Sequence, residues 1–256
     1  MLPPPFLLTG TIRNSIPNEL LSEIDEYLFD LNGYLIVENV LTADQIAACN
    51  EAVDLNIHRS TEEHGAHGAE ALAGTGNKRQ LNGMLTWPAP WSAPFRQLMD
   101  QPKIVPYLTE LLGPKFLLDH LYGMVMEQDA EGLVLHGGTG LNDDDDFGMT
   151  QFFYRFQAGK MRTGLTVVTY LLTDQGPDDG GFMCVPGSHK ANFPTPKDVE
   201  TLEKDIGIVR HLEAKAGSAI IFTEALTHGT LPWRASHQRR AMLYKYTPGT
   251  MYLAQE

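Results

Sequence analysis

The sequence predicts a β-rich α+β fold in a single domain that spans residues 1–256. Helix-type patterning is expected in a helical N-terminal part, at about residues 1–113. Short β-type runs separated by turn residues fill the remainder, at about residues 114–250. A chain of 256 residues is within the usual length of one β-rich domain. Its hydrophobic fraction of 43% is sufficient for a sizeable core.

Helical patterning occurs three times in the N-terminal part. In the first stretch, leucines and an isoleucine recur at helical spacing opposite acidic residues, and Gly33 ends the helix. In the second, Thr42 and Gln45 form a capping-box pair at the helix start. In the third, one or two short helices end before Gly113. The predicted helical stretches are residues 17–31, 42–57 and 95–112.

The β-type runs are short and are punctuated by glycine-containing turns, as in a sandwich or a barrel. Examples of such turns are Pro186-Gly187 and Ala216-Gly217. The predicted strands are residues 34–40, 116–128, 133–136, 164–172, 182–185, 208–212, 218–222 and 240–246. Residues 62–77 and 87–94 are expected to be irregular.

The charge and the cysteine content exclude several classes of protein. A formal net charge of −13 argues against binding a nucleic-acid polymer or an anionic membrane, although a local basic pocket remains compatible with it. Cys49 and Cys184 are the only cysteines, so no disulfide framework is predicted. The start lacks the features of a signal peptide, and no apolar run is long enough to span a membrane. A cytoplasmic location is therefore expected.

The chain has nine histidines, and two of them are candidates for a site. His136 ends a β-type run before two glycines, and His228 precedes Gly229 beyond another predicted strand. His189 is expected to orient a turn, with metal binding as the alternative. Surface or loop positions are predicted for His58, His64, His67, His211 and His237, and a packed position for His120.

Two imidazoles and one carboxylate on one face of an iron(II) ion leave three positions open for other ligands. The carboxylate usually lies two residues after the first histidine, but here that residue is Gly138, which has no side chain. One more position would then be free, and a halide fits such a vacancy. Arg239 or Arg240, at the start of a predicted strand, points inward by alternation, and an inward arginine needs an anion. The alternative for Arg239 is a surface ion pair.

Together these residues resemble the phytanoyl-CoA dioxygenase-like family of iron(II)/2-oxoglutarate enzymes. The resemblance covers about residues 33–248 and rests on His136, the segment 180–189 (GGFMCVPGSH), the segment 228–230 (HGT) and Arg239. It implies a double-stranded β-helix core, of the jelly-roll or cupin-like type, with N-terminal helices packed on it. It also implies that His136 and His228 bind iron(II), and that dioxygen is a cosubstrate. Arg239 and Thr230 would hold the distal carboxylate of 2-oxoglutarate.

The His-x-Gly motif at position 138 resembles that of the iron(II)/2-oxoglutarate-dependent halogenases, in which chloride fills the vacated position. This resemblance favours a halogenase that chlorinates an unactivated aliphatic C–H bond of a small molecule. One alternative is a hydroxylase in which water, or an acid from the run 143–146 (DDDD), completes the site. That acidic run is otherwise expected to stay solvated. Another alternative is a binding protein without catalytic activity.

Two local groups of aromatic and basic residues are candidates for substrate binding. They are Phe153 with Arg155, and Lys78 with Arg79. Such groups suit a small anionic substrate, and a free nucleotide is one candidate, because one halogenase resembling this family acts on a nucleotide. In the alternative interpretation, the aromatic residues belong to the core and the cations are solvated. The sequence indicates no oligomeric state.

Overall fold

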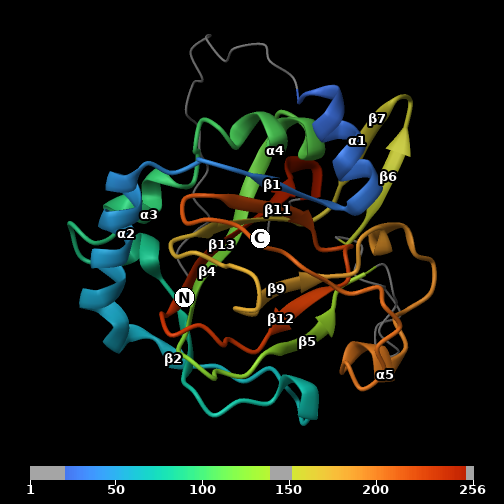
Figure 1. The fold of residues 1–256 in the computed structure, drawn as a ribbon. Coiled ribbons are helices and arrows are strands. Elements are labelled where there is room, and N and C mark those ends of the chain that lie inside the picture. The colour runs from blue at the N-terminus through green and yellow to red at the C-terminus, as the bar shows by residue number, and fades with distance from the viewer. Residues whose placement is uncertain (1–20, 139–151, 252–256) are drawn as a thin grey trace, which may run out of the picture.

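The computed structural model describes residues 21–138 and 152–251, and in them two antiparallel sheets and a separate hairpin form the β part of the chain (Figure 1). The large sheet has the order β1 (Tyr34–Val37), β11 (Ala219–Thr223), β8 (Thr166–Leu171), β13 (Arg239–Pro248), β4 (Phe116–Met126), β3 (Lys78–Leu81) and β2 (Thr61–Glu62). The small sheet has the order β10 (Arg210–His211), β9 (Gly181–Cys184), β12 (His228–Leu231) and β5 (Leu133–His136). The hairpin consists of β6 (Tyr154–Gln157) and β7 (Lys160–Thr163).

From β8 to β13 the chain passes back and forth between the two sheets: β8, β11 and β13 lie in the large one, and β9, β10 and β12 in the small one. This alternation is that of a jelly roll, so the predicted β-rich α+β class with a double-stranded β-helix core is confirmed. A hydrophobic cluster fills the space between the sheets, with Val167 and Ile220 from the large sheet and Phe182 and Cys184 from the small one.

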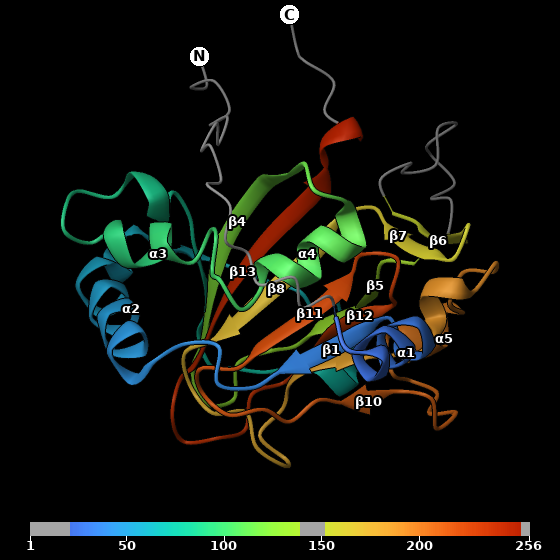
Figure 2. The same cartoon turned by 90° about the horizontal axis from the view of Figure 1, so that it is seen from above.

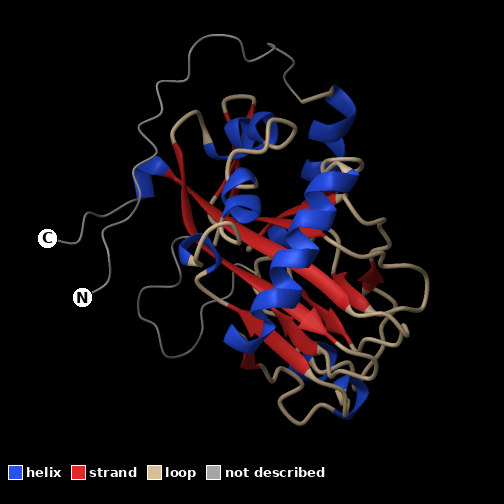
Figure 3. Ribbon diagram, turned by 90° about the vertical axis from the view of Figure 1, so that its left-hand side faces the viewer, coloured by secondary structure: helices blue, strands red, loops and turns tan. Residues whose placement is uncertain are grey.

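Short helices pack on the outer face of the large sheet, as Figures 2 and 3 show. They are α1 (Glu23–Asn32), α2 (Ala43–Asn56), α3 (Ala93–Gln97) and α4 (Val105–Leu112). The helix α5 (Lys197–Glu200) lies beside β5 instead. Single 3-10 turns are η1 (Ile57–Arg59), η2 (Glu70–Leu72), η3 (Met84–Thr86), η4 (Ser188–Lys190) and η5 (Gly249–Met251). In the part of the chain that the structure describes, no helix is long and apolar enough to cross a membrane.

Strand β13 carries both the core and the site because its side chains alternate. Met242, Tyr244 and Tyr246 face the helices, and the Tyr244 hydroxyl donates a hydrogen bond to the Phe95 carbonyl oxygen at 2.7 Å. Arg239 and Leu243 face the opposite way, into a cavity between the sheets. Alternation along a strand has a period of two residues, so it separates an apolar face from a functional face.

Several local predictions are confirmed. The Thr42–Gln45 capping box opens α2, with both of its hydrogen bonds present. Gly33 ends α1 with a φ of 81°, in the left-handed region that favours glycine. In residues 95–112, where one or two short helices were predicted, the structure has two, α3 and α4. The part of the first predicted helix before residue 21 lies outside the described residues.

The prediction of a helical N-terminal part was incomplete, because three strands in it join the large sheet. Of these, β1 was predicted, whereas β2 and β3 were not. The residues of strand β3 are mostly polar, but the strand pairs with the C-terminal end of β4. Strand β12 and the hairpin β6–β7 were also missed. All four residues of β12 pair with β9, so pairing partners rather than residue preferences make it a strand.

Gly33→Ala is expected to destabilise the fold through contact with a buried histidine. A Cβ atom at this position would lie 2.5 Å from His189 Nδ1, whereas the equivalent atom at Gly68 meets nothing within 4 Å. Both glycines have a positive φ, so both alanine variants carry the same backbone strain. We expect Gly33→Ala to lose about 1–3 kcal/mol more stability than Gly68→Ala in urea unfolding, because overpacking adds to the strain. Equal losses would contradict this assignment.

Candidate metal centre

The two candidate histidines lie opposite each other on neighbouring strands of the small sheet. His136 is the last residue of β5, His228 is the first residue of β12, and the two are in register. Their ring centroids are 4.3 Å apart. Residues separated by about ninety positions in the sequence therefore present two imidazoles to one point, at the edge of the cavity between the sheets.

Hydrogen bonds fix the tautomer of both rings. His136 Nδ1 lies 3.0 Å from the Val134 carbonyl oxygen, and His228 Nδ1 lies 2.7 Å from the Leu226 carbonyl oxygen. Because a carbonyl oxygen only accepts, each Nδ1 carries the hydrogen and each Nε2 keeps a free lone pair. Burial lowers the pKa of His136, and it lowers the pKa of His228 to about 3. Both rings are therefore neutral at pH 7, the form that binds a metal.

His136 and His228 differ in their access to solvent. His228 is buried, with 6% of its surface exposed, whereas the end of β5 leaves His136 an exposed face. The protein nevertheless surrounds the His136 ring closely enough for burial to lower its pKa. The pair therefore has an open side, which is required of a metal centre that must admit other ligands.

Gly138, two residues after the first histidine, is held in place by its backbone. Its N–H donates to the Glu224 carbonyl oxygen at 3.1 Å, and its φ is 94°. At Gly137, a Cβ atom would lie 2.7 Å from the same carbonyl oxygen. Position 138 is thus beside the histidines, but an acidic side chain there would strain the backbone. The acidic run 143–146 lies outside the described residues.

A carboxylate that was not predicted lies beside the histidine pair. Glu224 is only 2% exposed, and its Oε2 is 3.9 Å from His228 Nε2. Lys245 Nζ is 2.6 Å from Glu224 Oε1, although that contact lacks hydrogen-bond geometry. Burial raises the pKa of Glu224, but the neighbouring His228 and Lys245 side chains outweigh burial and lower it overall. Burial likewise opposes the charge of Lys245, yet Glu224 raises its pKa overall, so the two form a charged pair.

Arg239 lies in the same cavity and has no acidic partner among the residues that the structure describes. It is 4% exposed, and its Nε donates to Gln175 Oε1 at 3.2 Å. Its other contact is from Nη1 to Met126 Sδ at 3.6 Å. Burial lowers its pKa to about 10, and no carboxylate opposes this shift. A guanidinium buried without an acid requires an anion from outside the chain.

Other polar groups line this cavity. Lys78 is 5% exposed and donates through Nζ to the Gly132 carbonyl oxygen at 2.9 Å. Burial lowers the pKa of Lys78, while Glu131 and Glu63 act in the opposite direction. Thr230 is part of the lining. The Thr169 hydroxyl, also in the lining, is buried and has no hydrogen-bond partner in the described chain. The cavity is therefore lined by two cations and by three hydroxyl-bearing residues, the third being Tyr122.

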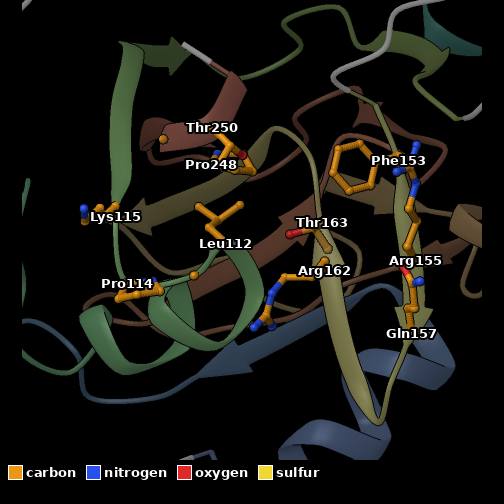
Figure 4. Close-up of a pocket in the computed structure, with 12 residues that line it drawn as sticks. Leu112, Pro114, Lys115, Phe153, Arg155, Gln157, Arg162, Thr163, Pro248 and Thr250 are labelled. Carbon is orange, nitrogen blue, oxygen red and sulfur yellow. The ribbon is translucent and has the colours of Figure 1, made fainter.

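The remaining candidates for substrate binding are dispersed. Phe153 and Arg155 line a larger cavity that shares no lining residue with the first (Figure 4). Arg79 is in neither cavity, and its guanidinium binds Ser60, with Nε 2.5 Å from the hydroxyl oxygen. The side chains of the predicted basic pair, Lys78 and Arg79, therefore lie in different places, because neighbours in a strand point to opposite faces.

Most of the other histidines are where the sequence placed them. His189 is 1% exposed and bonds the Asp30 carbonyl oxygen through Nε2 at 3.1 Å, which fits the predicted turn-orienting role. His120 was expected to be packed but is exposed, next to Tyr122 and Asp119. His211 was expected at the surface but is half-buried, because its Nε2 contacts the Gly180 carbonyl oxygen at 2.6 Å.

Three residues near the histidines and Arg239 were not predicted from the sequence, and only one of them could have been. Lys245 is six positions after Arg239, so alternation along β13 places both on the same face. Glu224 and Gln175 had no such signal, because both lie in connecting segments outside the strands.

A comparison with family models decides the relationship. The model of phytanoyl-CoA dioxygenase (PhyH) matches residues 29–241. The chain belongs to this family. The resemblance to iron(II)/2-oxoglutarate enzymes is thereby confirmed, whereas a halogenase is not distinguished from other members. No curated protein sequence matches this phytanoyl-CoA dioxygenase family member.

Solved structures similar to this family member are iron- and 2-oxoglutarate-dependent enzymes. HygX from Streptomyces hygroscopicus, with nickel, 2-oxoglutarate and hygromycin B bound, has a TM-score of 0.72 and 21% identity, covering 90% of this chain and 88% of its own. The epimerase SnoN from nogalamycin biosynthesis has a TM-score of 0.60 and 20% identity, covering 88% and 81%. The carbocyclase SnoK from the same biosynthesis has a TM-score of 0.60 and 16% identity, covering 91% and 86%. At these identities the likeness establishes the shared fold.

Proposed function

We propose that this phytanoyl-CoA dioxygenase family member uses iron(II), 2-oxoglutarate and dioxygen to functionalise an unactivated aliphatic C–H bond of a small molecule. The observation that carries this proposal is the pair of histidines in one cavity with Arg239, a buried cation that has no acid. The histidines would hold the metal, and Arg239 would bind a dicarboxylate cosubstrate. HygX, which has the same fold, was solved with 2-oxoglutarate and a small-molecule ligand bound.

Each residue of the cavity has one task in this proposal. The free Nε2 atoms of His136 and His228 would bind iron(II). Arg239 would pair with the distal carboxylate of 2-oxoglutarate, and the Thr230 hydroxyl would donate to the same group. Iron(II) with these cosubstrates supplies an oxidant that removes a hydrogen atom from carbon. Gln175 is a positioning residue, because its Oε1 accepts from Arg239 and from the Phe182 N–H.

Two outcomes for the activated carbon are proposed. Gly138 favours transfer of a chloride, because no side chain fills the position after the His-x motif. Glu224 favours hydroxylation, because its buried carboxylate lies 3.9 Å from His228 Nε2 and repels a halide. Product mass after turnover in chloride, and then in bromide, distinguishes the outcomes. A halogenase gives products that differ by the mass of the halogen, whereas a hydroxylase gives the same oxygenated product in both salts.

A binding protein without catalytic activity is the remaining alternative, and it has its own test. It predicts that the protein releases no succinate from 2-oxoglutarate in the presence of iron(II) and dioxygen. Decarboxylation, even when it is uncoupled from a substrate, would exclude this alternative.

The larger cavity is the proposed binding place for the anionic part of the substrate. Its volume is about 550 Å³, and it lies between α4, the hairpin β6–β7 and the end of β13 (Figure 4). The Arg155 guanidinium lies over the Phe153 ring, 4.7 Å from its centroid, so a cation and an aromatic face are presented together. The segment that follows β7 runs from this cavity to Glu224, because Thr163 lines the cavity and the Leu165 carbonyl oxygen accepts from the Glu224 N–H at 2.9 Å.

Arg155→Ala is expected to weaken binding of an anionic probe without affecting 2-oxoglutarate. With adenosine monophosphate as the probe, we expect at least a tenfold loss of affinity, since a hydrogen bond to a charged group contributes about 1.5–3 kcal/mol. Isothermal titration calorimetry measures both ligands. Arg210→Ala, which removes an exposed arginine from β10, is the control. Equal nucleotide affinity in the two variants would remove Arg155 from the substrate site.

A further inference from the structure

Glu224 and Gly138 are neighbours of each other and of the histidine pair. Glu224 directly follows β11 and lies four residues before His228. Its carbonyl oxygen accepts the Gly138 N–H at 3.1 Å, so the two residues are neighbours through their backbones. A carboxylate from position 224 therefore starts beside the place that a side chain at position 138 would occupy.

The Glu224 carboxylate is directed at a metal-binding atom. Its Oε2 is 3.9 Å from His228 Nε2, the nitrogen whose lone pair is free because Nδ1 donates to the Leu226 carbonyl oxygen. Two donor atoms bound at right angles to one metal, with bonds of about 2.1 Å, are about 3 Å apart. Across residues 21–138 and 152–251, no three His, Cys, Asp or Glu side chains are already close enough together to hold a metal ion. Glu224 Oε2 must therefore move about 1 Å closer to His228 Nε2 for the two atoms to share a metal.

Lys245 explains how this carboxylate is oriented. Its Nζ is 2.6 Å from Oε1, whereas the contact with His228 Nε2 is made by the other oxygen, Oε2. Lys245 also offsets a negative charge that would otherwise be buried alone. A second residue that binds one oxygen of a ligating carboxylate is a common arrangement around protein-bound metals.

We propose that Glu224 supplies the third protein ligand of the metal centre, replacing the carboxylate that position 138 lacks. This inference rests on the proposed function, because it requires iron(II) at His136 and His228. One consequence is that the position predicted to hold a halide is taken by a carboxylate. Oxygen transfer, rather than halogen transfer, is then the expected outcome.

The test measures metal binding without turnover. Iron(II) and 2-oxoglutarate are added without oxygen, and the visible absorbance of the iron–2-oxo acid chelate is titrated in three proteins. These are the parent, Glu224→Gln, and the double variant Glu224→Gln/Lys245→Met, which removes the charge of both members of the pair. We expect both variants to bind iron(II) at least 10–100-fold more weakly than the parent, since even residues that only support a ligand have effects of this size. Circular dichroism establishes that each variant is folded.

Chloride and formate provide a second measurement that a structural role would not alter. In Glu224→Ala, either anion is expected to restore part of the iron affinity by entering the space left by the side chain. In the parent, neither anion is expected to change the absorbance.

The possible failures are distinguishable. If the parent acquires no absorbance, the metal centre itself is wrong and both proposals fall. If the parent acquires it and the double variant binds iron(II) equally well, only the assignment of Glu224 falls. A chloride-dependent shift in the parent would also overturn the assignment, because it would mean that the position at the metal is open.

Discussion

His228→Ala is expected to abolish iron(II) binding and iron-dependent succinate formation while leaving the fold intact. The variant removes one of two neighbouring imidazoles, whose ring centroids are 4.3 Å apart, and a single imidazole cannot hold the metal at micromolar iron. His136→Ala is expected to behave in the same way. The loss should exceed about a hundredfold in affinity, since residues that only support a ligand already contribute 10–100-fold. Anaerobic titration with iron(II) measures it.

The control for this prediction is His64→Ala. His64 has an exposed side chain that contacts Glu131 at 3.3 Å, and it is not part of the cavity. Its replacement is expected to leave iron binding unchanged. Full activity in either His136→Ala or His228→Ala would mean that the ligands are wrong, and His189 would then be the next histidine to test.

Arg239→Ala is expected to raise the dissociation constant of 2-oxoglutarate by a factor of at least about 30. The side chain is buried and lacks an acid, so its removal leaves the bound carboxylate without its partner. Truncating one member of a buried charge pair typically costs about 2–5 kcal/mol. Calorimetry on the anaerobic iron(II) protein measures this constant. Arg239→Lys should recover only part of the affinity, because an ammonium group cannot form the bidentate pair.

Arg240→Ala is the matched control, since it tests the register of β13. Arg240 faces away from the cavity, and its Nη2 is 2.5 Å from Oδ1 of Asp54, a residue of α2. We expect its loss to affect stability slightly and 2-oxoglutarate binding not at all. A large effect at Arg240 and none at Arg239 would place the wrong arginine in the site.

Predictions from the sequence succeeded where the cause of a feature is local. The capping box at Thr42 and the end of α1 at Gly33 depend on residues within one turn. The inward orientation of one arginine at the start of β13 follows from the pleat, which alternates side chains between faces. The glycines at 180, 181 and 187 all have positive φ, as the predicted turns around them require.

Predictions failed where the cause lies in a distant segment. The polar segment Lys78–Leu81 became β3 because β4 offered an edge with which to pair. His228–Leu231 became β12 because β5 and β9 lie on either side of it. Charged residues such as Lys78 and Glu224 were not expected to be buried, because burial of a charge is favourable only when partners from elsewhere surround it.

By itself, the sequence determined the fold class, the family resemblance and the positions of His136, His228 and Arg239, because strand alternation and motif spacing are written locally in the chain. Only the tertiary structure decided that these three residues share one cavity, that Arg239 has no acid within the described parts of the chain, and that Glu224 and Lys245 stand beside the histidines. The physical reason is that strand pairing and sheet packing bring together residues from β5, β12, β13 and the segment after β11. Such contacts are set by the summed burial of the whole core, which no single segment of the sequence encodes.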